Sequence, residues 1–228
     1  DDKGGPHRGH SRPTAMECTA AVLSLAEMHG LPSAERHAPK PDPDPTVSGE
    51  SCGGEGQSVL DALVQTILSQ NTTDVQSSKG FATMKSEFPT WDAVRNAPAA
   101  AVEATVRSCG LAEIKVARIQ AILNTLHTEH GECTLEHLRS EPESVVKERL
   151  TRFKGVGPKT AACVMMFAMR RAEFPVDTHV WRISKSLGWV PKAATRESTY
   201  EHMNLRVPDQ LKFDLHCLLV THGKRCKS

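Results

Sequence analysis

Apolar residues recur every three or four positions through most of the chain after residue 57, which is the period of one buried helix face. Ile119, Ile122 and Leu126 show this spacing clearly within the run 113–130. The alternation of apolar and polar residues that marks a strand is hard to find. The pattern therefore predicts an all-α fold with short connections. Predicted helices cover residues 14–29, 59–69, 74–88, a short run from 90, 98–110, 113–130, 143–150, 158–171, 178–187, 195–203 and 208–222.

Residues that favour helix starts stand where several of these runs begin. Ser58, Thr73 and Thr90 each precede a run and can accept a hydrogen bond from a first-turn N–H group. Ser140 and Glu143 have the spacing of a capping box, in which each side chain bonds the backbone of the other residue. These cap residues predict the same helix starts as the apolar period does.

The first 57 residues have a different composition. Residues 1–13 are rich in Gly, His, Arg and Pro, and residues 32–56 carry four prolines at alternating positions before a glycine cluster. Such segments bury too little apolar surface to fold alone. We expect residues 1–57 to be largely disordered linker, with one amphipathic helix near 14–29.

The chain as a whole is close to neutral, with a formal charge of +1, so its overall charge does not indicate a nucleic-acid partner. Residues 147–185 differ, because nine basic residues there stand against three acidic ones. A positive segment in a neutral protein suits a phosphate-facing surface. A solvated helix face would give the same pattern, so charge alone does not decide between the two.

The seven cysteines are scattered along the chain without a Cys-x-x-Cys pair. An odd and dispersed set is typical of a reducing compartment rather than of a disulfide framework. No apolar run approaches the roughly 20 residues of a membrane span. We therefore expect an intracellular protein without a membrane partner, in the nucleus or an organelle if its source is eukaryotic.

The segment 153–161, Phe-Lys-Gly-Val-Gly-Pro-Lys-Thr-Ala, predicts a glycine-pinched hairpin that runs into a helix. Gly155 and Gly157 can adopt positive φ and leave room for a close ligand, while Val156 can pack between the helices and hold the turn rigid. Pro158 suits the first helical position. The unpaired N–H groups of a helix start attract a phosphate oxygen. Because Gly-x-Gly is common, an ordinary helix corner remains an alternative.

Lys159 falls in the first turn of this helix, where the helix dipole and partial burial disfavour the ammonium form. A neutral amine could attack C1′ of a nucleotide, expel the base and form a Schiff base that is prone to β-elimination. The alternative is a surface lysine that contacts phosphate. Asp177 precedes the predicted helix 178–187, either as a simple N-cap or also as a carboxylate that stabilises positive charge at C1′.

The two motifs together, Gly-Val-Gly-x-Lys-Thr-Ala and then Glu-Phe-Pro-Val-Asp-Thr-His at 173–179, resemble the helix-hairpin-helix-GPD superfamily of DNA glycosylases. The resemblance is to the endonuclease III branch and covers roughly residues 58–226. In this family the lysine and the aspartate of the two motifs are catalytic, and they fall on Lys159 and Asp177. Family members that only remove bases lack this lysine, so its presence favours a combined glycosylase and abasic-site lyase.

The resemblance also implies the domain arrangement. Two helical lobes would enclose DNA, with the active site in the cleft between them. One would be a six-helix lobe at 58–171 that contains the hairpin 153–161, and the other would join residues 172–228 to the N-terminal helix.

Further DNA contacts follow from the same resemblance. Asn71 matches the residue that enters the gap left by an extruded base, and its neighbour Gln70 could substitute for it. His179 would contact a phosphate or cap its helix. Lys115, which follows another family corner at Gly110, is expected to be solvated or to contact phosphate. The hairpin would contribute Gly155, Val156, Gly157 and Thr160.

Most endonuclease III relatives continue after a His-Gly pair with four cysteines that hold an iron–sulfur cluster. Here His222 and Gly223 are followed by Cys226 and only two further residues. One cysteine cannot hold a cluster that takes four thiolates. We expect no metal and no cofactor, and a cluster only if the C-terminus is truncated.

The sequence therefore predicts a base-excision repair DNA glycosylase with β-elimination lyase activity, acting as a monomer on double-stranded DNA with a damaged or modified base. Oxidised pyrimidine is the expected substrate from the family resemblance. Residues 70–72 and 187–191 are also similar to plant 5-methylcytosine glycosylases. The alternatives are a non-catalytic helix-hairpin-helix DNA-binding module and a monofunctional glycosylase for mismatched bases or 5-methylcytosine.

Overall fold

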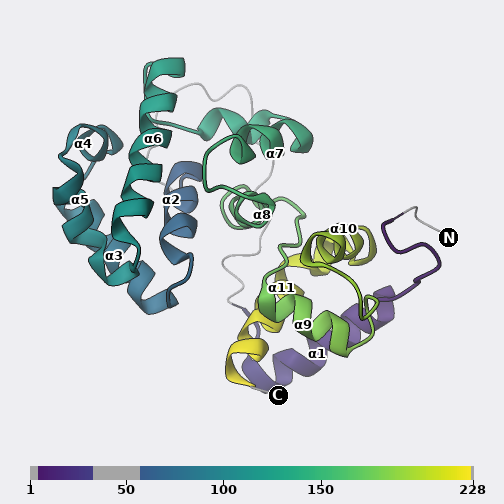
Figure 1. The fold of residues 1–228 in the computed structure, drawn as a ribbon. Helices are drawn as coiled ribbons and strands as arrows, with labels where there is room; N and C mark the ends of the chain where they lie inside the picture. Colours follow the sequence, from purple (N-terminus) through teal and green to yellow (C-terminus); the bar gives the residue numbers. More distant parts are fainter. Residues whose placement is uncertain (1–4, 33–56, 227–228) are drawn as a thin grey trace. The chain divides into compact units, whose positions relative to one another are not determined.

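The computed structural model describes residues 5–32 and 57–226. These residues form helices and turns without any strand, which confirms the all-α prediction. Within them, no helix combines the length and apolar character needed to cross a membrane. The α-helices (Figure 1) are α1 (Ala15–His29), α2 (Val59–Ser69), α3 (Asp74–Glu87), α4 (Trp91–Asn96), α5 (Ala99–Val106), α6 (Ala112–His130), α7 (Glu143–Thr151), α8 (Pro158–Phe167), α9 (Thr178–Ser186), α10 (Arg196–Arg206) and α11 (Asp209–Arg225), with short 3-10 helices η2 (Arg107–Cys109) and η3 (Glu136–Ser140).

Side-chain caps confirm several predicted helix starts. The hydroxyl groups of Ser58, Thr73 and Thr90 each accept a hydrogen bond from the backbone N–H three residues further on. Thr14 and Glu17 form a complete capping box at the start of α1. Each cap satisfies a first-turn N–H group that has no partner within its own helix.

The capping box predicted at Ser140 and Glu143 is wrong. Ser140 ends η3, and its hydroxyl donates to the carbonyl oxygen of His137 at 3.1 Å. α7 begins after Pro142 without a side-chain cap, because the φ of −57° at Pro142 already directs the chain into the helix.

α8 is shorter than its apolar pattern predicts, ending at Phe167 instead of Arg171. Arg170 has a left-handed φ of +55°, which a continuing α-helix does not allow. The N–H of Arg171 instead donates to the carbonyl oxygen of Met165 at 3.0 Å. This turn directs the chain into the loop that precedes Asp177.

The chain divides into two compact units, residues 54–164 and residues 1–53 with 165–228. In the unit 54–164, α2 is buried along most of its length and packs against α3 and α6, and α5 packs against both of these helices (Figure 1). The buried residues of α2 are Val59, Leu60, Ala62, Leu63, Val64, Ile67 and Leu68. The burial of α2 therefore fixes the position from which the residues after Ser69 continue.

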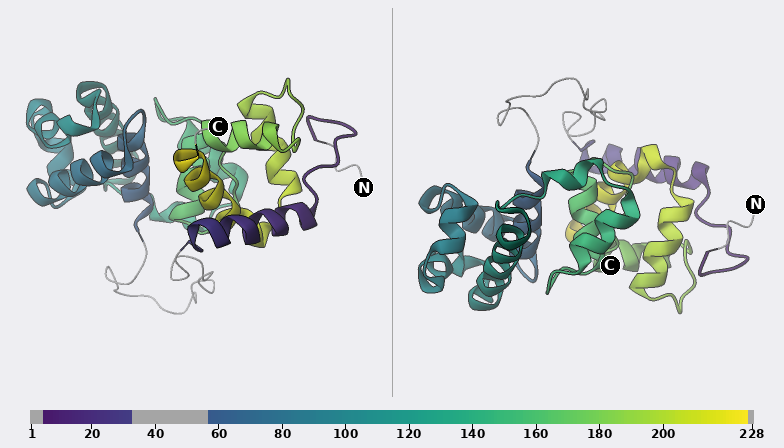
Figure 2. Two further views of the ribbon diagram at one scale, coloured as in Figure 1. Left: turned by 90° about the horizontal axis from the view of Figure 1, so that it is seen from below. Right: turned by 90° about the horizontal axis from the view of Figure 1, so that it is seen from above.

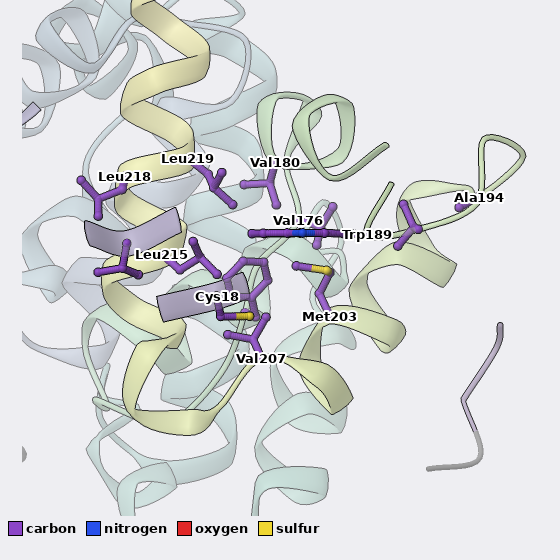
Figure 3. Packing of buried hydrophobic residues seen from close by; sticks show 13 residues of the cluster. Cys18, Val176, Val180, Trp189, Ala194, Met203, Val207, Leu215, Leu218 and Leu219 are labelled. Carbon is purple, nitrogen blue, oxygen red and sulfur yellow. The ribbon is translucent and has the colours of Figure 1, made fainter. Parts of the chain in front are cut away.

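The second unit has its own apolar core, drawn in Figure 3. α1 packs against α11, and α9 packs against both α10 and α11 (Figure 2). The core residues are Cys18, Val22, Phe174, Val176, Val180, Trp189, Val190, Ala194, Met203, Val207, Leu215, Leu218 and Leu219. Phe174 and Val176 belong to the loop before Asp177, so this core anchors the loop directly.

The segment before α1 has a defined path along α10. The ring Nε2 of His202 donates to the carbonyl oxygen of Arg12 at 2.6 Å, and Arg206 contacts carbonyl groups of the same segment. The expectation of disorder therefore does not hold for residues 5–13, because their polar groups find partners on α10. Residues 33–56 of the predicted linker lie outside the described part of the chain.

Candidate active site

The hairpin leads into α8 as the sequence predicts. Of the two glycines that can adopt positive φ, Gly155 does so with φ of +88°, and Gly157 does not. Phe153 and Val156 are buried and anchor the turn, and the N–H of Val156 donates to the carbonyl oxygen of Phe153 at 3.0 Å. A Cβ added to Gly157 would meet no atom within 4 Å. The backbone therefore requires glycine at 155, and the face at 157 is open to a ligand.

Lys159 stands in the first turn of α8, directly after Pro158 at the first helical position. Its side chain is exposed, and not partly buried as predicted. Thr160 is buried, and its hydroxyl oxygen accepts from Nε2 of Gln70 at 3.4 Å. Since the side chains of Val156 and Thr160 are both buried, a ligand at the hairpin would meet their backbone groups.

Gln70 ties the end of α2 to the hairpin. Its Nε2 donates to the carbonyl oxygen of Gly155 at 3.1 Å, and its Oε1 accepts from Nη1 of Arg118 at 3.3 Å. The Arg118 side chain lies over Gly155, because a Cβ built on that glycine would come within 2.6 Å of the arginine Cδ. The amide of Gln70 is thus engaged within the protein, and a contact with DNA would have to replace these bonds.

Asn71 and Leu111 are exposed residues on two turns of the same unit. Their φ angles are +54° and +51°, a left-handed conformation that asparagine tolerates and leucine rarely adopts. Leu111 is 57% exposed. A hollow of roughly 580 Å³ lies between the two turns, and its walls include Asn71 and Gly110. Leu111 is not among the predicted site residues, because it falls between the predicted helices 98–110 and 113–130 and belongs to no motif.

Lys115 is buried, so the expectation of a solvated or phosphate-contacting lysine is wrong. Its Nζ donates to the carbonyl oxygens of Leu68 at 2.8 Å and Cys109 at 2.7 Å. These carbonyl groups lie near the ends of α2 and η2, where helix acceptors lack partners. Burial lowers the pKa of Lys115 from its ordinary value. Lys115 thereby fastens together the segments that carry Asn71 and Leu111.

Asp177 caps α9 as predicted. Its Oδ1 accepts a hydrogen bond from the N–H of Val180 at 2.8 Å. The side chain is half-buried. A carboxylate has a second oxygen with its own lone pairs, so capping and a chemical role are compatible at this position.

Side chains of α10 and α11 hold the loop before Asp177. Asn204 accepts from the N–H of Phe174 at 2.8 Å and donates to the carbonyl oxygen of the same residue at 3.2 Å. The other contacts are Tyr200 Oη to Glu173 Oε2 at 2.7 Å, Lys212 Nζ to the Ala172 oxygen at 2.9 Å and His216 Nδ1 to the Pro175 oxygen at 2.9 Å. No motif spacing marks these residues, so they could not be identified from the sequence. We call the loop 172–177 with these partners the aspartate loop.

His179 lies half-buried in the first turn of α9, against Gly223 of α11. A Cβ on Gly223 would come within 2.5 Å of the His179 Cβ. Glycine at 223 therefore permits α9 and α11 to approach closely at this point. The structure gives His179 a packing contact, and its predicted contact with phosphate stays a prediction.

Cys226 lies beside His29 and His222, with one ligand atom of each within 4.8 Å of the others. The ring nitrogens His29 Nε2 and His222 Nδ1 are 3.0 Å apart. An iron–sulfur cluster of the endonuclease III kind takes four thiolates, and this group offers one. In the described part of the chain these residues therefore do not fit such a cluster, and no chemical step is assigned to one.

An all-α fold with a glycine hairpin before one helix and a capping aspartate before the next defines a class of DNA repair proteins. The chain matches the "HhH-GPD superfamily base excision DNA repair protein" family over residues 64–209, which is more than half of its length. The chain belongs to this superfamily, as the sequence motifs indicated. Membership supports a DNA glycosylase.

Individual relatives agree with this assignment. The Arabidopsis thaliana protein named "Putative DNA glycosylase At3g47830" is 45% identical over 243 residues, covering 100% of this chain and 82% of that protein. The protein "DNA glycosylase/AP lyase ROS1" of the same plant is 34% identical over 151 residues, covering 59% of this chain but 11% of that protein. A solved endonuclease III–DNA complex shares the fold, with a TM-score of 0.72, 22% identity and coverage of 94% of this chain and 88% of that chain.

Proposed function

We propose that this protein is a bifunctional DNA glycosylase that removes an oxidised pyrimidine and then cleaves the strand at the abasic site. The observation that carries the proposal is the exposed amine of Lys159 in the first turn of α8, directly behind the open face of Gly157. The printed name of the ROS1 relative, a glycosylase and AP lyase, supports the lyase part. The likeness to an endonuclease III of Sulfolobus acidocaldarius, 27% identical over 185 residues, supports the branch.

Lys159 is the proposed nucleophile. Its neutral Nζ forms a bond to C1′ while the glycosylic bond breaks, and the base leaves with the bonding electrons and takes up a proton. The attached nitrogen loses a proton to Asp177, and this proton passes to O4′ as the sugar ring opens to a protonated Schiff base. A water molecule then takes up a C2′ proton, and the electron pair forms a C2′–C3′ double bond as the C3′–O bond breaks and the 3′ phosphate leaves. Water hydrolyses the imine and regenerates the lysine.

The other residues have binding roles in this proposal. The N–H groups at the start of α8, behind Gly157, would hold a phosphate oxygen without reading sequence. Asn71 and Leu111 would enter the duplex where the base has left, since polar and apolar side chains can both replace a base in the stack. His179 would contact a phosphate at the start of α9.

Borohydride trapping tests the nucleophile. Reduction of a Schiff base should give a covalent protein–DNA adduct with an abasic-site duplex, and Lys159→Ala should abolish that adduct. Lys154→Ala is the matched control, because Lys154 is another exposed lysine of the same hairpin segment. An adduct that survives Lys159→Ala, or that fails equally in both variants, would contradict the role of Lys159.

A panel of duplexes, each with one altered base, tests the substrate. We expect base release and strand nicking with oxidised pyrimidines. Release of 5-methylcytosine or of a mismatched base, in place of an oxidised pyrimidine, would contradict the proposed substrate. It would leave the proposed role of Lys159 unchanged. Base release without nicking would indicate a monofunctional enzyme. Tight binding of every duplex without base release or adduct would indicate the non-catalytic DNA-binding module.

A further inference from the structure

Three side chains with different donor atoms meet at one end of α6. Asp92 lies in the first turn of α4, His127 in the last turn of α6 and Cys133 in the turn that follows. One ligand atom of each lies within 4.8 Å of the others. No motif groups these residues, because 41 positions separate Asp92 from Cys133. None of the three belongs to the proposed catalytic machinery.

His127 supplies an independent observation. Its Nδ1 is buried and has no hydrogen-bond partner. The nearest acidic oxygen, Asp92 Oδ1, is 3.7 Å away, which is too long for a hydrogen bond. A buried polar atom without a partner costs free energy. The last turn of a helix also favours positive charge, because the carbonyl groups at its C-terminus carry partial negative charge.

The distances suit a tetrahedral metal ion. Zinc binds nitrogen and oxygen at about 2.0–2.2 Å and thiolate sulfur at about 2.3 Å, so neighbouring ligand atoms are roughly 3.4–3.6 Å apart. Asp92 Oδ1 is 3.7 Å from both His127 Nδ1 and Cys133 Sγ. A shift of a few tenths of an ångström would bring both pairs to these spacings.

We propose that Asp92, His127 and Cys133 form a zinc site, with water in the fourth position. Zinc takes nitrogen, sulfur and carboxylate ligands together, whereas calcium and magnesium prefer oxygen alone. Binding converts the Cys133 thiol to a thiolate and releases its proton to solvent. The site links α4 to the end of α6, so the bound ion would stabilise this corner of the unit 54–164.

Arg95 is a charged group in direct contact with this site. Its Nε donates to Asp92 Oδ1 at 3.1 Å. A ligating carboxylate commonly keeps such a second hydrogen bond, which orients it. The guanidinium charge at the same time repels a cation. Removing the charge should therefore tighten zinc binding if repulsion dominates, and Arg95→Gln retains a donor while it removes the charge.

The test uses Zn²⁺ alone, added to the metal-free full chain in competition with a chromogenic chelator. Cys226→Ser with His222→Ala serves as the background, because His29, His222 and Cys226 form a second group of possible ligands. We expect one zinc per chain in this background. Cys133→Ser and His127→Gln should each weaken binding by more than the roughly 10–100-fold that loss of an outer partner costs.

Co²⁺ gives a second readout that does not depend on stability. A cobalt–thiolate absorption band should form in the background protein and disappear in Cys133→Ser, while circular dichroism shows that both remain folded. The proposal is overturned if the background protein binds no zinc. It is equally overturned if Cys133→Ser and His127→Gln bind zinc as tightly as the background does.

Discussion

The hairpin and the aspartate loop each carry a proposed catalytic residue in or just before the first turn of a helix, but they are held in different ways. The hairpin depends on backbone conformation, with Gly155 at positive φ and the buried side chain of Val156. Gln70 adds hydrogen bonds of 3.1–3.4 Å from one neighbouring segment. The aspartate loop is instead fastened by four polar side chains from α10 and α11.

The difference has a physical reason. A tight turn between two helices can be specified by a few adjacent residues, because glycine and proline restrict the local backbone to one path. A longer connection exposes several backbone groups that need partners, and buried groups without partners are costly. Glu173 is 1% exposed, so its carboxylate depends on partners such as Tyr200. Substitutions that disturb the hairpin should therefore lie in the hairpin itself. The aspartate loop should also be disturbed by substitutions on α10 and α11, which supply its partners.

Charge removal at Asp177 should have the largest effect on activity. Asp177→Asn keeps an oxygen that can accept from Val180, and asparagine is an equally good N-cap. The free energy of unfolding should stay within about 0.5 kcal/mol of wild type. Single-turnover base release should fall by roughly 10²–10⁴-fold, as expected for loss of an acid–base or electrostatic group.

Asp177→Ala separates the two roles of this residue. It removes the cap as well as the charge, so stability should also fall by about 1 kcal/mol. Urea unfolding and base release would be measured for both variants. Full base release by Asp177→Asn, with Asp177→Ala losing activity only in proportion to its unfolded fraction, would reduce Asp177 to a simple cap.

Asn204→Ala should have the largest effect on stability. It leaves the N–H and the carbonyl oxygen of Phe174 without their present partner. An orphaned buried group costs about 1–3 kcal/mol. Base release should fall as well, because Asp177 stands three residues after Phe174. Urea unfolding measures the first effect, and single-turnover kinetics on fully folded protein measures the second. Unchanged kinetics would show that the hydrogen bonds between Asn204 and Phe174 support only the fold.

The two hairpin glycines should respond differently to one added methyl group. Gly155→Ala forces a positive φ on alanine, at about 1–2 kcal/mol, and also displaces Arg118. Gly157→Ala should leave stability unchanged, since the new methyl would meet nothing within 4 Å. It should nevertheless weaken DNA binding if a phosphate approaches this face. Equal DNA affinity for Gly157→Ala and wild type would exclude a close phosphate there.

The same contrast explains what the sequence could and could not predict. The positions of Lys159 and Asp177 at helix starts could be predicted, because their motifs are local and these helix starts follow from proline and cap chemistry. Tyr200, Asn204 and His216 were not, because partners that lie many residues away leave no spacing to recognise. Lys115 was assigned to the surface by its charge. Only the fold shows that two helix ends leave carbonyl groups within reach of its ammonium.

Acid should destabilise α10, which supports the aspartate loop, through His202. This histidine lies on α10 two residues before Asn204. Burial is the main cause that lowers the pKa of His202, and the rings of His7 and His10 lie 5.3 and 5.6 Å from it. Above the ordinary histidine pKa of about 6.5, both the folded and the unfolded chain hold this ring neutral. As the pH falls below that value, the unfolded chain takes up a proton first, so the free energy of unfolding decreases.

Hydrogen exchange at pH 7.5 and pH 5.5 would localise this effect. We expect protection to fall more in α10 than in α8 of the wild-type protein, because the titrating ring of His202 lies on α10. His202→Gln retains a donor for the carbonyl oxygen of Arg12 and cannot take up the proton. The variant should therefore lose less protection in α10 on acidification than wild type does. An equal loss in both proteins would assign the acid sensitivity to other groups.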